Sequence, residues 1–256
     1  MAKERQVVRG IVLRSVDTGE ADKMLTVLTA QLGKLPVVAK GARGRRSRVT
    51  AATELLSYAE MTLSESRGYQ YLSEASSLAH FRCLRQDVTL LSLGSYFAQL
   101  TDAVTYEALP AEDVLSHLLN ALYALSELRR PQKLVKAAFE CRLMALSGFE
   151  PLLTACAVCG AAEPAAPVLD VSSGLLRCRS CPKSGGVSVP LTPAALAAMR
   201  YVLYGDPRRL YSFSLPPADL DRMARAAETY VTAQLERSFS TLEFYQSLTE
   251  HGAAGE

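Results

Sequence analysis

The first eighty residues alternate apolar and polar positions with the period of two that is typical of β-strands. The clearest segment is 57–64, in which Ala59, Met61 and Leu63 fall on one face of the predicted strand. Glycine-containing turns separate several of these segments. The predicted strands are residues 6–14, 24–29, 35–40, 57–64 and 69–74. Five short strands in about 75 residues predict a small antiparallel barrel.

The pattern changes after His80, where apolar residues recur at spacings of three and four, as in amphipathic α-helices. The apolar stripes of three predicted helices lie in residues 90–104, 115–125 and 134–145. Helical spacing returns after Thr192 and Pro193, an N-cap residue followed by proline at the first helical position. A last helix is predicted through Leu220 and Tyr230, and we expect residues 251–256 to be disordered.

Residues 151–190 interrupt the helical pattern, because they are rich in Cys, Pro and Gly and show little periodicity. The chain is therefore predicted to be an α+β protein of several domains. The expected parts are a barrel domain at 1–79, the first part of a helical domain at 80–150, a metal-binding module at 151–190, and the last helices and tail of the helical domain at 191–256.

Composition and charge narrow this picture. Hydrophobic residues make up 49% of the chain and charged residues 21%, which is typical of a globular protein. The net charge is +2, but residues 1–80 carry 12 Lys and Arg against 8 Asp and Glu, so the predicted barrel is the basic part. The first residues lack the apolar stretch of a signal peptide, and no run of roughly 18 apolar residues is present. We therefore expect a cytoplasmic protein without a membrane span, in which cysteines stay reduced.

Four of the six cysteines form two Cys-x-x-Cys pairs separated by 18 residues. Each pair makes a tight turn that directs two sulfurs at one point, and two such pairs complete a tetrahedral thiolate site. The spacing lies in the range that is typical of zinc sites. The predicted ligands of one structural Zn²⁺ ion are Cys156, Cys159, Cys178 and Cys181.

Other readings of these cysteines compete with structural zinc. A catalytic zinc ion keeps an open coordination position, and no His or carboxylate lies close to these cysteines in the sequence except Glu163 and Asp170. A redox Cys-x-x-Cys is expected near a βαβ pattern, which this sequence lacks. An iron–sulfur cluster also takes four thiolates, and the sequence leaves that alternative open. Two pairs in so short a stretch argue against free cysteines, and we favour structural zinc.

A second candidate site consists of cations around the third predicted strand and the loop after it. Arginine can donate two hydrogen bonds to one phosphate, and each neutralised phosphate releases counterions. Small five-stranded barrels commonly bind single strands, so we interpret these cations as DNA contacts rather than as a solvated loop. The candidates are Lys34, Lys40, Arg43, Arg45, Arg46 and Arg48, extended by Arg9, Arg14 and Arg67. Tyr69 and Tyr71 share a strand face and would suit base stacking, although cross-strand packing is the reading we favour.

No catalytic constellation is present in the sequence. It lacks a phosphate-binding Gly-x-x-x-x-Gly-Lys-Ser/Thr loop, a nucleophile elbow and a His-Glu-x-x-His pair. We therefore expect a protein that is not an enzyme and has no small-molecule substrate. Two alternatives stay open, namely a zinc-ribbon adaptor that acts through protein contacts without binding DNA itself, and a metal-dependent hydrolase or nuclease.

Three stretches of the chain carry a resemblance to a known family. They are residues 19–23, 25–29, 33–34 and 38–43, then 142–143, 146 and 148–152 leading into Cys156, and finally 230–235, 240–242 and 246–248. In their order and spacing, up to about residue 248, these stretches resemble the RecO family of bacterial DNA repair and recombination mediators.

The resemblance implies an N-terminal OB-fold, a helical C-terminal domain and a zinc-binding insertion. It also implies binding of single- and double-stranded DNA and annealing of complementary strands. The partners that it implies are RecR and SSB, whose C-terminal tail would be recognised, with RecA loaded indirectly onto SSB-coated DNA. Association with the nucleoid would follow from DNA binding. Of the candidate DNA contacts, Lys34, Lys40 and Arg43 lie in the matching stretches, and the other cations are inferred from charge alone.

Overall fold

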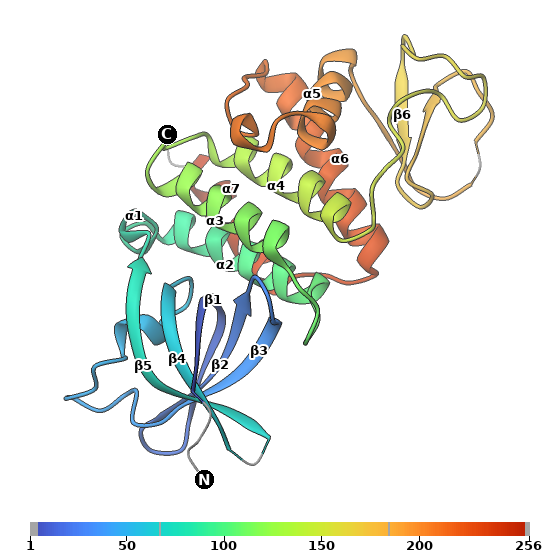
Figure 1. Ribbon diagram of the computed structural model, residues 1–256. Helices are drawn as coiled ribbons and strands as arrows, with labels where there is room; N and C mark the ends of the chain where they lie inside the picture. The colour runs from blue at the N-terminus through green and yellow to red at the C-terminus, as the bar shows by residue number, and fades with distance from the viewer. Residues whose placement is uncertain (1–4, 67, 184, 254–256) are drawn as a thin grey trace. The chain divides into compact units, whose positions relative to one another are not determined.

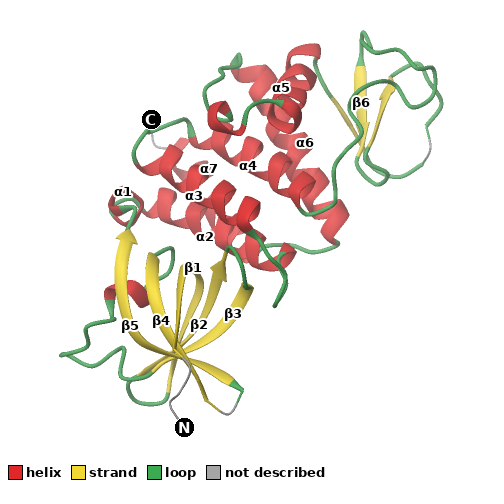
Figure 2. Cartoon of the chain, in the orientation of Figure 1, coloured by secondary structure: helices red, strands yellow, loops and turns green. Residues whose placement is uncertain are grey.

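A computed structural model describes residues 5–66, 68–183 and 185–253 of the chain. By their contacts the residues group into two compact units. One unit is formed by Met1–Glu127 together with Phe239–Glu256, and the other by Leu128–Ser238. Strands come first along the chain, helices follow, and a small module of strands interrupts the helices of the second unit (Figures 1 and 2).

Within the described residues of the first unit, five strands close into a barrel in the order β1-β2-β3-β5-β4. The strands are β1 (Arg5–Thr18), β2 (Asp22–Thr29), β3 (Gly33–Ala39), β4 (Tyr58–Ser66) and β5 (Tyr69–Ala79). β3 and β5 pair in parallel, and the other neighbours are antiparallel. Ala59, Met61 and Leu63 of β4 are 0%, 0% and 1% exposed and lie in the barrel core. The predicted five-stranded barrel is confirmed.

All five strands are longer than their apolar patterns predicted, and β1 and β5 differ the most. β5 continues to Ala79 because it pairs with β4 as far as Tyr58, beyond the predicted end at residue 74. β1 covers Arg5–Thr18 rather than 6–14, because it pairs with β4 at its start and with β2 at its end. The added residues are mostly exposed and polar, so pairing between distant segments rather than burial keeps them in the sheet.

The three helices predicted after the barrel are confirmed as α2, α3 and α4. The helix predicted after Thr192 is also confirmed, and the Thr192 hydroxyl accepts a hydrogen bond from Ala195 N at its start. The helices are α1 (Arg82–Arg85), α2 (Val88–Val104), α3 (Glu112–Ser126), α4 (Gln132–Leu146), α5 (Pro193–Tyr204), α6 (Pro217–Leu235) and α7 (Ser240–Ala253), with two 3₁₀ turns, η1 (Ala51–Thr53) and η2 (Pro207–Arg209). None of the described helices has the length and apolar character that crossing a bilayer requires.

Helix α7 was not predicted, and the expected disorder is wrong for residues 251–253, which belong to this helix. α7 returns to the first unit and packs on α2. Phe239 precedes it, is 1% exposed and meets the Tyr96 ring edge-on at 5.7 Å between centroids. The Thr241 hydroxyl donates a hydrogen bond to the side-chain oxygen of Gln99. Residues 254–256 lie outside the described residues.

The two ends of the barrel have different surroundings. At the helix end, the β2–β3 turn contacts the connection between α2 and α3, where Lys34 N donates to Tyr106 O at 3.1 Å and Ala111 N donates to Ala30 O at 2.8 Å. At the loop end lie the β1–β2 turn, the end of β3 and the β4–β5 turn (Figure 1). These contacts with the helical part of the first unit therefore lie at the helix end of the barrel and not at the loop end.

Gly33 makes the contact at the helix end possible. Its φ is +62°, and a Cβ atom built on it would lie 2.2 Å from Leu109 O and 2.7 Å from Tyr106 O. We expect Gly33→Ala to lower the free energy of unfolding by about 2 kcal/mol or more, because both the backbone conformation and the close approach favour glycine. Chemical denaturation measures this loss. Gly19→Ala is the matched control, since its φ is +54° but nothing lies within 4 Å of the added atom.

The second unit is built on α4, against which α5 and α6 pack. A buried ion cluster joins α4 to α6, because Lys136 Nζ lies 2.7 Å from a carboxylate oxygen of Glu140 and 2.7 Å from one of Glu228. The Tyr230 hydroxyl of α6 donates to Phe149 O at 3.1 Å. These contacts hold the start of the cysteine-containing segment against a helical base.

The cysteine-containing segment has a sheet of its own, which the sequence pattern did not predict. Its strands are β6 (Pro167–Asp170), β7 (Leu175–Cys178) and β8 (Ser188–Pro190), in the order β7-β6-β8. Val168, Leu169, Leu176 and Val189 are buried in it. Strands of three or four residues are too short to show a period, so the segment looked irregular. The predicted order of barrel, helical domain and cysteine module is confirmed, whereas the boundaries 1–79, 80–150, 151–190 and 191–256 stay a prediction.

Candidate metal centre and nucleic-acid interface

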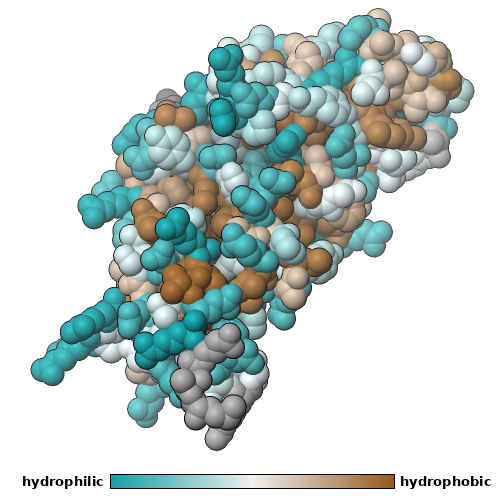
Figure 3. Space-filling model, in the orientation of Figure 1, coloured by the Kyte–Doolittle hydropathy of each residue, from teal (hydrophilic) through white to brown (hydrophobic). Residues whose placement is uncertain are grey.

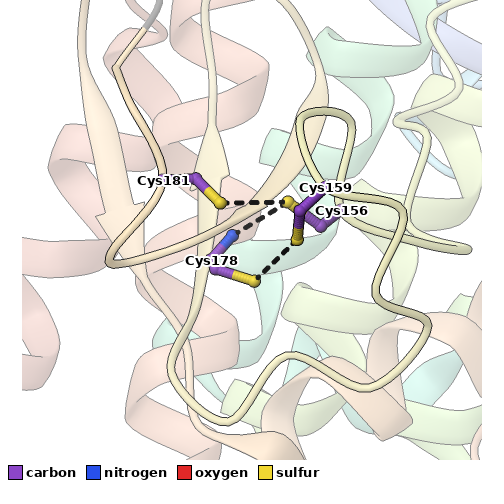
Figure 4. Close-up of side chains that lie close together, drawn as sticks. All are labelled: Cys156, Cys159, Cys178 and Cys181. Atoms are coloured by element: carbon purple, nitrogen blue, oxygen red, sulfur yellow. Dashed lines mark hydrogen bonds between the residues drawn. The ribbon is translucent and has the colours of Figure 1, made fainter.

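The four predicted metal ligands lie together in the module. All four sulfurs lie within 4.8 Å of one another. Cys156 Sγ lies 3.9 Å from Cys181 Sγ, and Cys159 Sγ lies 3.7 Å from Cys178 Sγ (Figure 4). A zinc ion bound tetrahedrally at about 2.3 Å from each sulfur requires sulfurs about 3.8 Å apart. The cluster therefore fits a tetrahedral thiolate-bound ion, and its sulfur separations are far longer than the roughly 2 Å of a disulfide.

Backbone hydrogen bonds form the two turns that carry these cysteines. Gly160 N donates to Cys156 O at 2.9 Å, and the φ of Gly160 is +75°, which a glycine adopts without strain. Cys181 N donates to Cys178 O at 3.1 Å in the second turn. Ala157 N donates to Leu176 O of β7 at 2.8 Å. This hydrogen bond joins the first turn to the strand that ends at Cys178.

The thiols of Cys156, Cys178 and Cys181 do not lose their protons equally. Backbone N–H groups, first that of Cys159 and also that of Cys178, lower the pKa of the Cys156 thiol to about 6. The pKa of the Cys178 thiol is raised to about 12, first by its hydrogen bond with Cys159 and then by burial. Burial, followed by the side chain of Cys159, also raises the pKa of Cys181. The charges of the Cys156 and Cys159 thiolates also raise the pKa of Cys178 and Cys181. A bound cation would offset this repulsion between thiolates, so metal binding and proton release are coupled here.

Arg200 of α5 holds the first cysteine turn in place. Its guanidinium donates to three carbonyl oxygens, those of Leu153 at 2.8 Å, Thr154 at 3.0 Å and Ala162 at 2.6 Å. It also lies 2.6 Å from a carboxylate oxygen of Glu163. These carbonyls lie on both sides of Cys156 and Cys159 in the sequence, so one side chain clamps the two ends of the segment.

We expect Arg200→Gln to weaken metal binding about tenfold, because the ligands must then be ordered by the metal alone. Competition with a chromogenic chelator measures the affinity, and circular dichroism checks the fold. The control is Arg222→Gln, an exposed arginine on α6. Equal zinc affinity in the two variants would count against the clamp.

The predicted DNA contacts are divided among several places on the barrel. Lys34 lies at the helix end, where its Nζ is 2.8 Å from a carboxylate oxygen of Asp102 on α2. Arg9 lies on β1 and pairs with Glu60 of β4 at 3.0 Å. Arg14 is exposed further along β1. Arg67 lies outside the described residues. Lys34 and Arg9 therefore already have carboxylate partners within the barrel unit.

The remaining candidates gather at the loop end. The basic loop (residues 40–50) projects from the barrel (Figure 1), and hydrophilic side chains cover this projection in Figure 3. The start of the basic loop is fixed to the β1–β2 turn, because Arg43 N donates to Ala21 O at 3.0 Å and Gly41 N donates to a carboxylate oxygen of Asp22 at 2.7 Å. Arg43 Nε also lies 3.1 Å from a carboxylate oxygen of Asp17. The acidic residues of the turn thus anchor the loop.

Three arginines of the basic loop differ from Arg43. Arg45, Arg46 and Arg48 are exposed, and within the described part of the chain they make no ion pair. Lys40 is exposed as well, and its Nζ lies 5.3 Å from the centre of the Tyr71 ring. Charge in the sequence had suggested one continuous patch, but the structure separates Lys40, Arg45, Arg46 and Arg48, which make no ion pair among the described residues, from Arg9, Lys34 and Arg43, which lie against carboxylates of the barrel unit.

Comparisons with known proteins cover almost the whole chain. Residues 1–81 match the family model described as Recombination protein O N terminal, and residues 85–243 match Recombination protein O C terminal. The chain is 34% identical to the DNA repair protein RecO of Symbiobacterium thermophilum over 248 residues, which cover 94% of this chain and 96% of that one. It is 32% identical to the RecO protein of Heliobacterium modesticaldum over 251 residues, or 94% and 91% of the two chains.

A third relative extends the same likeness. The DNA repair protein RecO of Acetivibrio thermocellus is 28% identical over 239 residues, which cover 93% of this chain and 95% of the relative. The two family models meet where the barrel ends and the helices begin. The chain therefore belongs to the RecO family of DNA repair proteins.

Proposed function

We propose that the chain is a recombinational DNA repair mediator in the cytoplasm. It binds single- and double-stranded DNA, anneals complementary strands and, with RecR, helps to load RecA onto SSB-coated DNA. The observation that carries this proposal is the basic loop, whose Arg45, Arg46 and Arg48 are exposed and make no ion pair among the described residues. Such side chains bind phosphate without first giving up a carboxylate.

Annealing follows from contacts of this kind. Phosphate contacts position a strand but carry no sequence information, so any two complementary strands are bound alike. Cations between two strands lower their mutual repulsion and leave the bases free to pair. Asp17 and Asp22 hold the start of the basic loop, so its arginine side chains stay at the loop end of the barrel.

We propose that one Zn²⁺ ion binds to the four cysteines and acts as a scaffold. Four protein ligands close the coordination shell, whereas a catalytic zinc ion keeps a position for water or substrate. Among the described residues this is the single group of three or more potential metal ligands, and it contains no carboxylate. A protein that works without catalysis fits this arrangement better than a nuclease does.

Annealing of complementary strands coated with SSB tests the proposed function. We expect the chain to speed this reaction, and the variant Arg45→Gln/Arg46→Gln/Arg48→Gln to lose most of the acceleration. A rate unchanged by the wild-type chain, at concentrations that saturate DNA binding, would refute the mediator role. Incubation of labelled DNA with the chain and Mg²⁺ is the control, in which we expect no cleavage.

A zinc-ribbon adaptor that acts through protein contacts is the second candidate. Its support is the apolar surface of the module, where Leu152, Val158 and Val187 are each more than half exposed, and where Figure 3 shows apolar residues near β6. The adaptor predicts no binding to short oligonucleotides without a partner protein. A gel-shift assay with the purified chain therefore separates the two candidates.

A further inference from the structure

The outer surface of the barrel carries one apolar row that crosses four strands. The strand registers place Val16 of β1 opposite Met24 of β2, Met24 opposite Val38 of β3, and Val38 opposite Tyr71 of β5. Paired residues on neighbouring strands have side chains on the same face of the sheet. These four residues, the outer row, therefore form one continuous line across the sheet.

The outer row faces away from the barrel core. Strand neighbours alternate between faces, and Leu25, Val37 and Leu72, each adjacent to a member of the row, are buried in the core. Val16 is 42% exposed, and Met24, Val38 and Tyr71 are partly exposed. The outer face of β4 is more polar, because Glu60, Thr62 and Ser64 follow Tyr58 on it. Val7, Tyr69 and Leu78 are also exposed on the barrel strands, but the outer row is the set that the strand registers align across four strands. A continuous apolar line on a protein surface is typical of an interaction site.

Cations flank the outer row on both sides. Lys40 Nζ lies 5.3 Å from the centre of the Tyr71 ring at one side, where the basic loop begins. On the other side Arg14 belongs to the next row, opposite Thr26 of β2, and is exposed. Asp17 and Asp22 are the carboxylates closest in sequence to Val16 and Met24 of the outer row. Asp17 pairs with Arg43, and Asp22 accepts a hydrogen bond from Gly41 N. An apolar strip between cations is complementary to a strand that has flat bases and anionic phosphates.

We propose that the outer row seats the unpaired bases of single-stranded nucleic acid. A base stacks on the Tyr71 ring, neighbouring bases pack on Val38, Met24 and Val16, and the phosphates lie along Arg14, Lys40 and the basic loop. This inference rests on the proposed function and adds strand selectivity to it. A duplex offers the same phosphates but keeps its bases paired, so the row favours single strands. With one ring among four residues the contact stays weak enough for bases to leave and pair.

A single tryptophan reports on the row directly, because the chain contains no tryptophan. In Tyr71→Trp, stacking of oligo-dT should quench the indole emission, while a duplex of the same length should leave it nearly unchanged. Anisotropy of labelled DNA measures the bound fraction in the same samples. Unchanged emission with bound oligo-dT, or equal quenching by the duplex, would overturn the proposal. Quenching by a polyglutamate peptide but not by oligo-dT would overturn it in favour of a protein ligand.

Removal of the ring gives the second measurement. We expect Tyr71→Leu to bind oligo-dT about tenfold more weakly, in line with the loss of one stacked base. Affinity for the duplex should stay within about twofold, and the dependence of affinity on salt should not change, because phosphate contacts remain. Tyr71→Phe should restore binding. Tyr123→Leu, on exposed Tyr123 of α3 in the same unit, is the matched control.

The outcomes separate the inference from the proposed function. No DNA binding by the wild-type chain contradicts both. Equal loss of single-strand and duplex binding in Tyr71→Leu, or no loss, contradicts the outer row as a base site while the basic loop keeps its role. If Tyr71→Leu does not fold, the indole emission of Tyr71→Trp still tests whether bases bind to the outer row.

Discussion

With Arg45, Arg46 and Arg48 all replaced by glutamine, the chain binds a single-stranded oligonucleotide about 100-fold more weakly at 0.1 M salt, and about equally near 1 M salt. Each phosphate contact contributes roughly −0.7 to the slope of log affinity against log salt concentration. Three lost contacts therefore make the slope shallower by about 2, which amounts to about 100-fold over one decade of salt. Fluorescence anisotropy over a series of salt concentrations measures both quantities.

The control for this prediction removes the same charge elsewhere. Arg208, Arg222 and Arg225 are exposed in the second unit, and their replacement by glutamine lowers the net charge equally. We expect this variant to keep the wild-type slope. If the two triple variants lost affinity alike, net charge rather than the basic loop would determine binding. Lys34→Gln should change DNA affinity little, because Lys34 pairs with Asp102.

In Cys178→Ser, bound zinc should fall from one ion per chain to nearly none, and residues 151–190 should become open to trypsin at Arg179 and Lys183. Metal binding to zinc-finger peptides contributes about 10–16 kcal/mol, which is comparable to the whole stability of a typical domain. The buried strands of the module and the Arg200 clamp reduce the loss here. Metal analysis and limited proteolysis, followed by mass spectrometry, measure the two effects.

DNA binding provides the decisive comparison for the cysteine variant. The barrel belongs to the other compact unit, so we expect the affinity of Cys178→Ser for single-stranded DNA to stay within about twofold of wild type. Cys83→Ser, outside the cluster, is the control for a loss of one thiol. A folded, zinc-free variant that no longer bound DNA would make the module part of the DNA surface.

Local patterns predicted the features of this chain that depend on local chemistry. The alternation of Ala59, Met61 and Leu63 identified β4, because burial on one face imposes a period of two. The cysteine spacing identified the cluster, because two tight turns suffice to bring the sulfurs together. Neither inference required knowledge of a distant partner.

Features that depend on distant partners were missed or misplaced. The pairing of Lys34 with Asp102, 68 residues away in sequence, could not be predicted from local charge, and the role of Lys34 in DNA binding stays a prediction. Helix α7 mixes buried Leu242 and Tyr245 with exposed Phe244, so its apolar stripe was less clear than those of the other helices. The outer row is invisible in sequence, because only the register of four strands aligns Val16 with Tyr71.

Photocrosslinking tests directly whether the loop end of the barrel is the surface that binds DNA. Oligo-dT is crosslinked to the full chain by ultraviolet light, and the modified peptides are mapped by mass spectrometry. We expect crosslinks in the β1–β2 turn, the basic loop and the start of β5, within residues 14–24, 38–50 and 69–72. Crosslinks confined to residues 151–190 or to the helices of the second unit would show that DNA binds elsewhere.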